Sequence, residues 1–423
     1  MVGKIKNFLD ERQSLFYCFF YGGLFCFALL LPFQDTSLSE SPLRFLGKSP
    51  SFLFLCLTFF LAVLKFGVNK FSIFILFYVC AFNFLSFLNY CDYFSYGRSL
   101  QGKGINLFVL NFIFLIPLLF NVEKSTLPRN FGWVVLLSFL ICFLGVFLVD
   151  IFHFSFFTSS FFHVDTIDQT RFRGFSYEPS MLATSIISLY LCYICINNKK
   201  ISVFDLVFIS FLLFFIQSKG GLLCFLISIL IAFNSVFFSL KKRYVFLLLV
   251  MVFSSFCFLI FMFVLDFDKY TSTITRGTLV LVPLFSLLDH PFGVGYFGFL
   301  DVFHQYLPSA VEFSKEYIHH DSGFREIDKY LVADTDSSIG SKSFFLNNVI
   351  VFGWPFIFLY FYSLFSAVKK CRSISRKDLE VLVWFIFLSL TLFVEGVGLY
   401  ALSLGFLVCK YEMHCVNKKN NER

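Results

Sequence analysis

The run Arg171-Phe-Arg-Gly-Phe-Ser-Tyr-Glu-Pro-Ser180 combines two guanidiniums, one carboxylate and a Glu-Pro helix start. Pro179 suits the first position of a helix, so a helix is expected to begin near Glu178. The free N–H groups and the dipole at that helix end favour an anion. Arg171 and Arg173 would add planar groups suited to phosphate. The run is therefore a predicted binding site for a lipid-linked diphosphate. Alternatively, Glu178 caps the helix and pairs with Arg173 only to hold the loop.

A second group of candidate residues surrounds Arg276, which is followed by an apolar stretch. Residues 278–288 are expected to form a helix lying at the membrane interface or dipping into it. Arg276 stands just before this helix, where it could contact an anionic substrate. A membrane-surface binding role is therefore the hypothesis for Arg276.

The next segment, His290-Pro-Phe-Gly-Val-Gly295, is rich in turn residues. Gly293 and Gly295 could let backbone N–H groups approach a ligand closely, with His290 beside them. The alternative is a tight turn that returns the chain to the bundle. The spacing is not a dinucleotide-binding fingerprint, because no strand is expected before it and no helix is expected to open on it.

Weaker candidates lie elsewhere. Lys219, in Ser218-Lys-Gly-Gly221, could attract an anion or extend its amine to the membrane surface. Three histidines could act as a general base: His304, His319 and His320. Carboxylate pairs such as Asp266 and Asp268 are common in loops by chance, so no metal site is predicted.

The composition identifies the elements that must position these groups. The 423 residues are 58% hydrophobic and only 14% charged, and they include 70 phenylalanines. Soluble domains are about 25% charged. Apolar runs of about 17–24 residues have the length that spans a membrane as a helix. The predicted fold is an all-α, polytopic membrane bundle.

Twelve transmembrane helices are expected within a single transmembrane domain, residues 1–423. Their predicted ranges are 14–33, 51–68, 70–89, 105–121, 131–152, 180–196, 201–217, 220–240, 244–265, 344–367, 379–395 and 397–411. The last two could instead be one span and a re-entrant segment. Lys-Lys pairs beginning at residues 199, 241 and 369 all fall on one side, which predicts that both termini are cytoplasmic.

This orientation leaves two external segments of interest. Residues 153–179 form external loop 3 between spans five and six. Residues 266–343 form a large external loop between spans nine and ten, long enough for helices of its own. The cytoplasmic loops have no room for a nucleotide-binding domain, so the function is expected to face outward.

The order and placement of three motifs resemble the O-antigen polymerase and ligase superfamily of integral membrane glycosyltransferases, which is GT-C-like. The resemblance covers about residues 130–367. Its motifs are Arg173-Gly-Phe-Ser-Tyr-Glu-Pro-Ser180, Ser218-Lys-Gly-Gly221, and Arg276 with the His290–Gly295 turn.

The resemblance implies transfer of a glycan from undecaprenyl diphosphate to the next lipid-linked repeat unit, at the outer face of the bacterial inner (cytoplasmic) membrane. It implies no cofactor, metal or nucleotide. The partners it implies are undecaprenyl-diphosphate-linked glycans, the lipid bilayer and a chain-length regulator, with no nucleic acid. It implies that Arg173 and Arg276 are catalytic, and Glu178 is the candidate base. The implied substrate contacts are Arg171, His290, Gly293, Gly295 and Lys219.

Within the superfamily, two features favour a polymerase. The ligases usually carry a histidine just before the span that follows the large loop, and residues 341–348 contain none. The Glu-Pro-Ser ending also looks more like the polymerases. The alternatives are a ligase that transfers glycan to lipid A core, and a flippase or other transporter. A twelve-span transporter would typically place its long loop inside, between spans six and seven.

Overall fold

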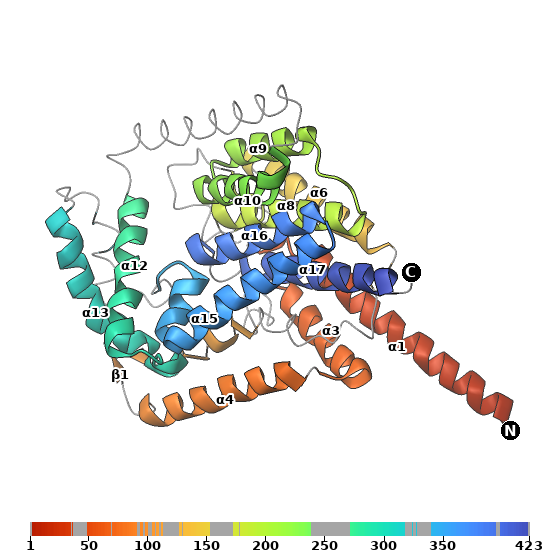
Figure 1. The fold of residues 1–423 in the computed structure, drawn as a ribbon, viewed down its shortest axis with the longest axis horizontal. Helices are drawn as coiled ribbons and strands as arrows, with labels where there is room; N and C mark the ends of the chain where they lie inside the picture. Colours follow the sequence, from red (N-terminus) through yellow and green to blue (C-terminus); the bar gives the residue numbers. More distant parts are fainter. Residues whose placement is uncertain are drawn as a thin grey trace.

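Twelve α-helices, one π-helical segment and a two-stranded hairpin make up the part of the chain that the computed structural model describes (Figure 1). The described residues are 2–34, 36, 49–68, 70–90, 94–95, 98–99, 104–105, 107–109, 111–112, 127–128, 130–152, 172–176, 178–237, 271–317, 324, 327, 340–394 and 398–421. The α-helices are α1 (Val2–Leu30), α3 (Ser51–Phe66), α4 (Lys70–Tyr90), α6 (Phe131–Gly145), α8 (Pro179–Ile196), α9 (Val203–Ile216), α10 (Lys219–Phe237), α12 (Thr271–Asp289), α13 (Gly295–Tyr317), α15 (Phe344–Ser373), α16 (Lys377–Leu392) and α17 (Gly398–Asn421). The π-helix η3 (Val146–Ile151) extends α6, and β1 (Phe94–Ser95) pairs antiparallel with β2 (Arg98–Ser99).

Four described segments are long and apolar enough to cross a membrane: Ile73–Tyr90, Phe131–Ile151, Pro179–Ile196 and Phe344–Ser373. Shorter apolar helical segments accompany them, among them Ser51–Phe66 and Phe204–Ile216. A helix satisfies its own backbone hydrogen bonds, which hydrocarbon requires. These features are those of a helical membrane protein.

Ten of the twelve predicted spans coincide with described helices. The predicted span 244–265 and most of 105–121 lie outside the described residues. The segment predicted to be the large external loop contains α12 and α13, and α12 begins at Thr271, earlier than the predicted residue 278. The expectation that no helix opens on the glycine turn is wrong, because α13 begins at Gly295.

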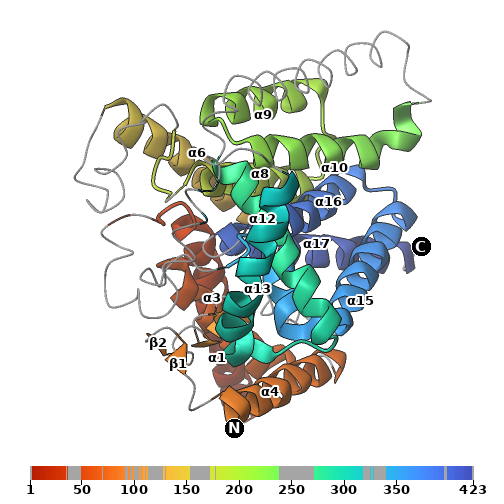
Figure 2. The same ribbon diagram turned by 90° about the vertical axis from the view of Figure 1, so that its left-hand side faces the viewer.

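Two hydrophobic cores organise the helices. The larger core surrounds α8, which packs against α6, α16 and α17. The smaller core joins α4, α12, α13 and the first part of α15. Because residues of α15 belong to both cores, this helix connects them. In Figures 1 and 2, α12 and α13 run side by side, across the direction of α4 and α10.

The turn between α12 and α13 fits against a kink in α15. Gly353 has φ 61° inside that helix. The Trp354 N–H donates to Pro291 O at 2.8 Å, and the Val294 N–H donates to Ile350 O at 3.1 Å. A side chain at Gly353 would collide with the carbonyl oxygen of Pro291. The kink therefore lets the backbone of α15 contact the backbone of the turn between α12 and α13.

Candidate functional site

The Arg173 turn, just before α8, is held by a carboxylate from another helix. Asp150 lies in η3, at the end of a segment long and apolar enough to cross a membrane. Its Oδ2 accepts the N–H of Arg173 at 2.9 Å and of Gly174 at 2.7 Å. Single π-helical turns are frequent at functional sites, and an ionisable residue within a span is a candidate functional group. Asp150 therefore joins the candidate residues.

Close packing fixes the same turn on its other sides. Gly174 has φ +56°, a conformation that glycine adopts without strain. A Cβ atom at Gly145 would lie 2.7 Å from the Phe175 ring, so the two segments touch without a gap. Phe175 stacks on Phe33 with ring centroids 5.3 Å apart, and its carbonyl accepts the Gln34 N–H at 3.1 Å. Segments from α6 and from the end of α1 thus position Arg173, which is half-buried.

The start of α8 is as predicted, with Pro179 at its first turn and Glu178 just before it in extended conformation. Glu178 occupies the N-cap position, as the capping alternative requires, but its side chain makes no capping hydrogen bond. Glu178 is exposed and accepts a hydrogen bond from Ser180 Oγ at 3.1 Å. Arg171 lies outside the described residues.

Lys219 begins α10, at the end of the bundle where α8 also begins. A Cβ atom at Gly221, two residues after Lys219, would lie 3.1 Å from Cβ of Ala183 near the start of α8. A Cβ atom at Gly220 would lie 3.0 Å from the Phe393 ring. The Phe344 N–H donates to Val394 O at 2.8 Å, which brings the start of α15 to this end.

Lys342, two residues before Phe344, has φ 53° and was not singled out in the sequence. Non-glycine residues in this conformation are uncommon and cluster at functional sites. We call Arg173, Lys219 and Lys342 the cationic end of the bundle. These three cationic residues come from separate elements near the positive end of the α8 dipole, which makes them candidates for contact with a multiply charged anion.

The second predicted group lies in the smaller core. Arg276 is on α12, and its Nε atom is buried without a hydrogen-bond partner among the described residues. The two glycines allow close backbone packing: a side chain at Gly293 would collide with Val351, and one at Gly295 with Ser86. His290 lies edge-on to Tyr306, with ring centroids 6.3 Å apart. The predicted ligand roles of Arg276, His290, Gly293 and Gly295 remain predictions.

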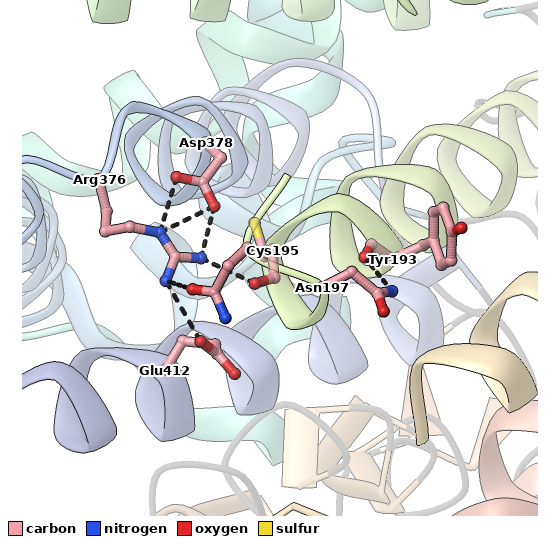
Figure 3. A network of polar contacts seen from close by, with 7 residues as sticks. Tyr193, Cys195, Asn197, Arg376, Asp378 and Glu412 are labelled. Atoms are coloured by element: carbon pink, nitrogen blue, oxygen red, sulfur yellow. Dashed lines mark hydrogen bonds and ion pairs between the residues drawn. The ribbon is translucent and has the colours of Figure 1, made fainter. Parts of the chain in front are cut away.

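A third polar cluster, which sequence reasoning missed, lies at the opposite end of α8 (Figure 3). Arg376, between α15 and α16, pairs with Asp378 at 2.6 Å and with Glu412 of α17 at 3.3 Å. Its Nη2 atom also donates to the carbonyl oxygen of Cys195 at 2.7 Å, and Nη1 donates to Asn198. The network joins the last residues of α8 and the start of α16 to the middle of α17.

The acidic neighbours of Arg376 favour its charged form. Burial alone would lower the pKa of Arg376, but the hydrogen bonds and charge of Asp378 outweigh it, so that pKa is raised. Buried ion pairs of this kind are stable only when hydrogen bonds satisfy both partners, as they do here. The cluster is filled by its own groups and therefore connects helices without offering a binding site.

Comparison with known proteins gives one relative. The chain is similar to a protein of Klebsiella pneumoniae described as an uncharacterized 49.5 kDa protein in cps region. The two are 28% identical over 397 residues, which cover 89% of this chain and 88% of that protein. No family model matches the chain. No solved structure matches it.

Proposed function

We propose that this protein is a membrane glycosyltransferase that polymerises undecaprenyl-diphosphate-linked repeat units into a surface polysaccharide. The observation that carries the proposal is the Arg173 turn, fixed by Asp150 beside the positive end of α8. The relative in a cps region, the name of a capsule polysaccharide gene region, supports a role in surface polysaccharide biosynthesis. The proposed location is the outer face of the inner membrane, with both termini cytoplasmic.

The proposed reaction is a displacement at a sugar carbon. A hydroxyl of the incoming lipid-linked unit attacks the anomeric carbon of the growing glycan. The bond from that carbon to the diphosphate breaks, undecaprenyl diphosphate leaves, and the hydroxyl proton passes to a base, for which exposed Glu178 is the candidate.

The cationic end would stabilise the negative charge that builds on the departing diphosphate. Preorganised donors are effective because they need no rearrangement during reaction, and one such donor contributes about 3–4 kcal/mol. Asp150 supplies the preorganisation by holding the Arg173 backbone. We propose Lys219 as a second contact, and Arg276 as a contact from the smaller core.

The test is deletion of the gene followed by gel analysis of the surface polysaccharide. A polymerase deletion should leave lipid A core bearing a single repeat unit. Loss of every attached unit, including single ones, would favour a ligase or a flippase and contradict the proposal.

Point variants then test the site. Arg173→Ala and Arg276→Ala should each abolish long chains while the protein still inserts. Arg173→Lys should restore chains only in part, because lysine keeps the charge but loses the two-pronged contact with phosphate. Normal chain lengths in both alanine variants would refute the site assignment.

A further inference from the structure

The outward face of α12 is apolar along three successive turns. Val280, Leu284 and Leu288 are 37%, 49% and 80% exposed. Residues four apart lie on neighbouring parts of one helix side, and Gly277, three residues before Val280, is also exposed. A helix surrounded by water carries polar residues on its outward face. This face therefore does not have the composition of a water-facing surface.

The neighbouring helix α13 has the opposite character. Its exposed residues are mainly polar, namely Gln305, Ser309, Glu312, Lys315 and Glu316. The exposed aromatic Phe313 contacts Phe285 of α12, with ring centroids 6.1 Å apart. The outward face of α12 is thus suited to an apolar medium, and the outward face of α13 is suited to water.

The apolar face of α12 continues onto a helix expected to meet lipid. Phe292 is exposed in the turn after α12, and the neighbouring Pro291 accepts the hydrogen bond of Trp354. Trp354 and Phe358 are themselves exposed on α15, which is long and apolar enough to cross a membrane. Lipid that covers α15 at this level is therefore adjacent to the face of α12.

The direction of α12 matches a position along a membrane surface. The hairpin of α12 and α13 is held at the Tyr90 end of α4, where Gly295 meets Ser86 and Gly298 meets the Tyr90 ring. Most of α4 forms a segment apolar enough to span, and α12 runs across it in both views (Figures 1 and 2). A helix that crosses the direction of a span at its end lies along the bilayer surface.

We propose that α12 is a membrane-surface helix whose Val280, Leu284 and Leu288 contact lipid acyl chains, while α13 covers it on the water side. Amphipathic helices of this kind bury their apolar face at the boundary of head groups and chains. Arg276 is four residues before Val280, about 6 Å along the helix axis. If the proposed function holds, this position puts Arg276 at the depth of a lipid-borne phosphate; the membrane contact itself does not depend on that function.

The experiment measures quenching of a fluorescent amino acid incorporated at position 284 of the full chain in lipid nanodiscs. Position 312, on the exposed face of α13, is the matched control, and position 288 repeats the test on α12. We expect nitroxide-bearing lipids to quench positions 284 and 288 several-fold more than position 312, and aqueous iodide to show the reverse order.

Two results would overturn the proposal. Iodide that reaches positions 284 and 288 as freely as 312 would show that the face is in water. Protection of both positions from both quenchers would show that protein, such as a second copy of the chain, covers it. The quenching result is separable from the proposed function. The polymerase assignment is tested by the glycan chain length that the Arg173→Ala variant produces, and that substitution should leave the quenching at positions 284 and 288 unchanged.

Discussion

Replacing Asp150 with alanine tests how the Arg173 turn is held. The Asp150 carboxylate accepts two backbone N–H groups, at 2.9 and 2.7 Å. Hydrogen bonds to charged groups contribute about 1.5–3 kcal/mol each, so the pair favours the observed turn by about 3–6 kcal/mol. Because Arg173 is only half-buried, water can replace part of both bonds, and we expect a net loss of about 2–3 kcal/mol.

That loss should appear as a slower reaction. At about 1.36 kcal/mol per tenfold change, it corresponds to a rate roughly 30- to 150-fold lower. The assay is the rate at which purified protein in nanodiscs joins two lipid-linked repeat units. The transfer rate of Asp150→Asn should lie between those of Asp150→Ala and the unmodified protein, because the amide oxygen still accepts hydrogen bonds but carries no charge.

A matched control is Asp205→Ala. Asp205 accepts the Ser202 N–H at 2.7 Å at the start of α9, and it also accepts the hydroxyls of Ser202 and Tyr190. Its loss therefore removes at least as many hydrogen bonds, away from the cationic end. Its transfer rate should stay close to that of the unmodified protein. The reasoning is refuted if Asp150→Ala reacts at the natural rate. It is also refuted if Asp150→Ala lowers the rate by the same factor in an Arg173→Ala background, since residues acting together are not additive.

Three further predictions concern stability. Arg376→Ala should lower the free energy of unfolding by about 3–5 kcal/mol, because Asp378 and Glu412 are left as unpaired charges. Unfolding of the detergent-solubilised protein measures this loss. A loss below about 1 kcal/mol contradicts the pairing. Gly293→Ala should lower the unfolding midpoint, because φ +78° and the contact with Val351 both oppose a side chain; an unchanged midpoint rules out that contact. Burial and the hydrogen bond to Asp289 raise the pKa of Tyr306 to about 12, so its stabilising contribution should be full below pH ~10 and lost as the pH rises to ~12. A difference titration of tyrosinate absorbance against Tyr306→Phe measures this, and a difference centred near pH 10 excludes it.

The sequence predicted the helices well, because apolar length largely decides where a chain can cross a membrane. The start of α8 was predicted to within a residue, since Glu-Pro is a local signal. The kink in α15 also has a local signal in the sequence, Gly353-Trp-Pro355.

The contacts between distant segments could not be predicted in the same way. Asp150 stands alone in an apolar run, which marks it as a candidate, yet nothing in the sequence links it to a turn 23 residues later. Arg376 has no signal in the sequence beyond its positive charge near other basic residues. Its pairing with Glu412 depends on how α17 packs against α8 and α16. The structure also gives Gly293 and Gly295 a packing role that the sequence did not predict, and their predicted ligand role stays a prediction.

The Arg376 network also has a consequence for biosynthesis. Cys195 O and Asn198 are synthesised long before Arg376, and Glu412 comes near the end of the chain. The end of α8 therefore enters the membrane with these contacts unmade, and the cluster is complete only after α17 has been translated. A chain that stops before residue 412 would contain every segment of the cationic end and still lack an acidic partner of Arg376. Such a chain should be less stable than the full chain, because Glu412 could no longer share the charge of Arg376 with Asp378.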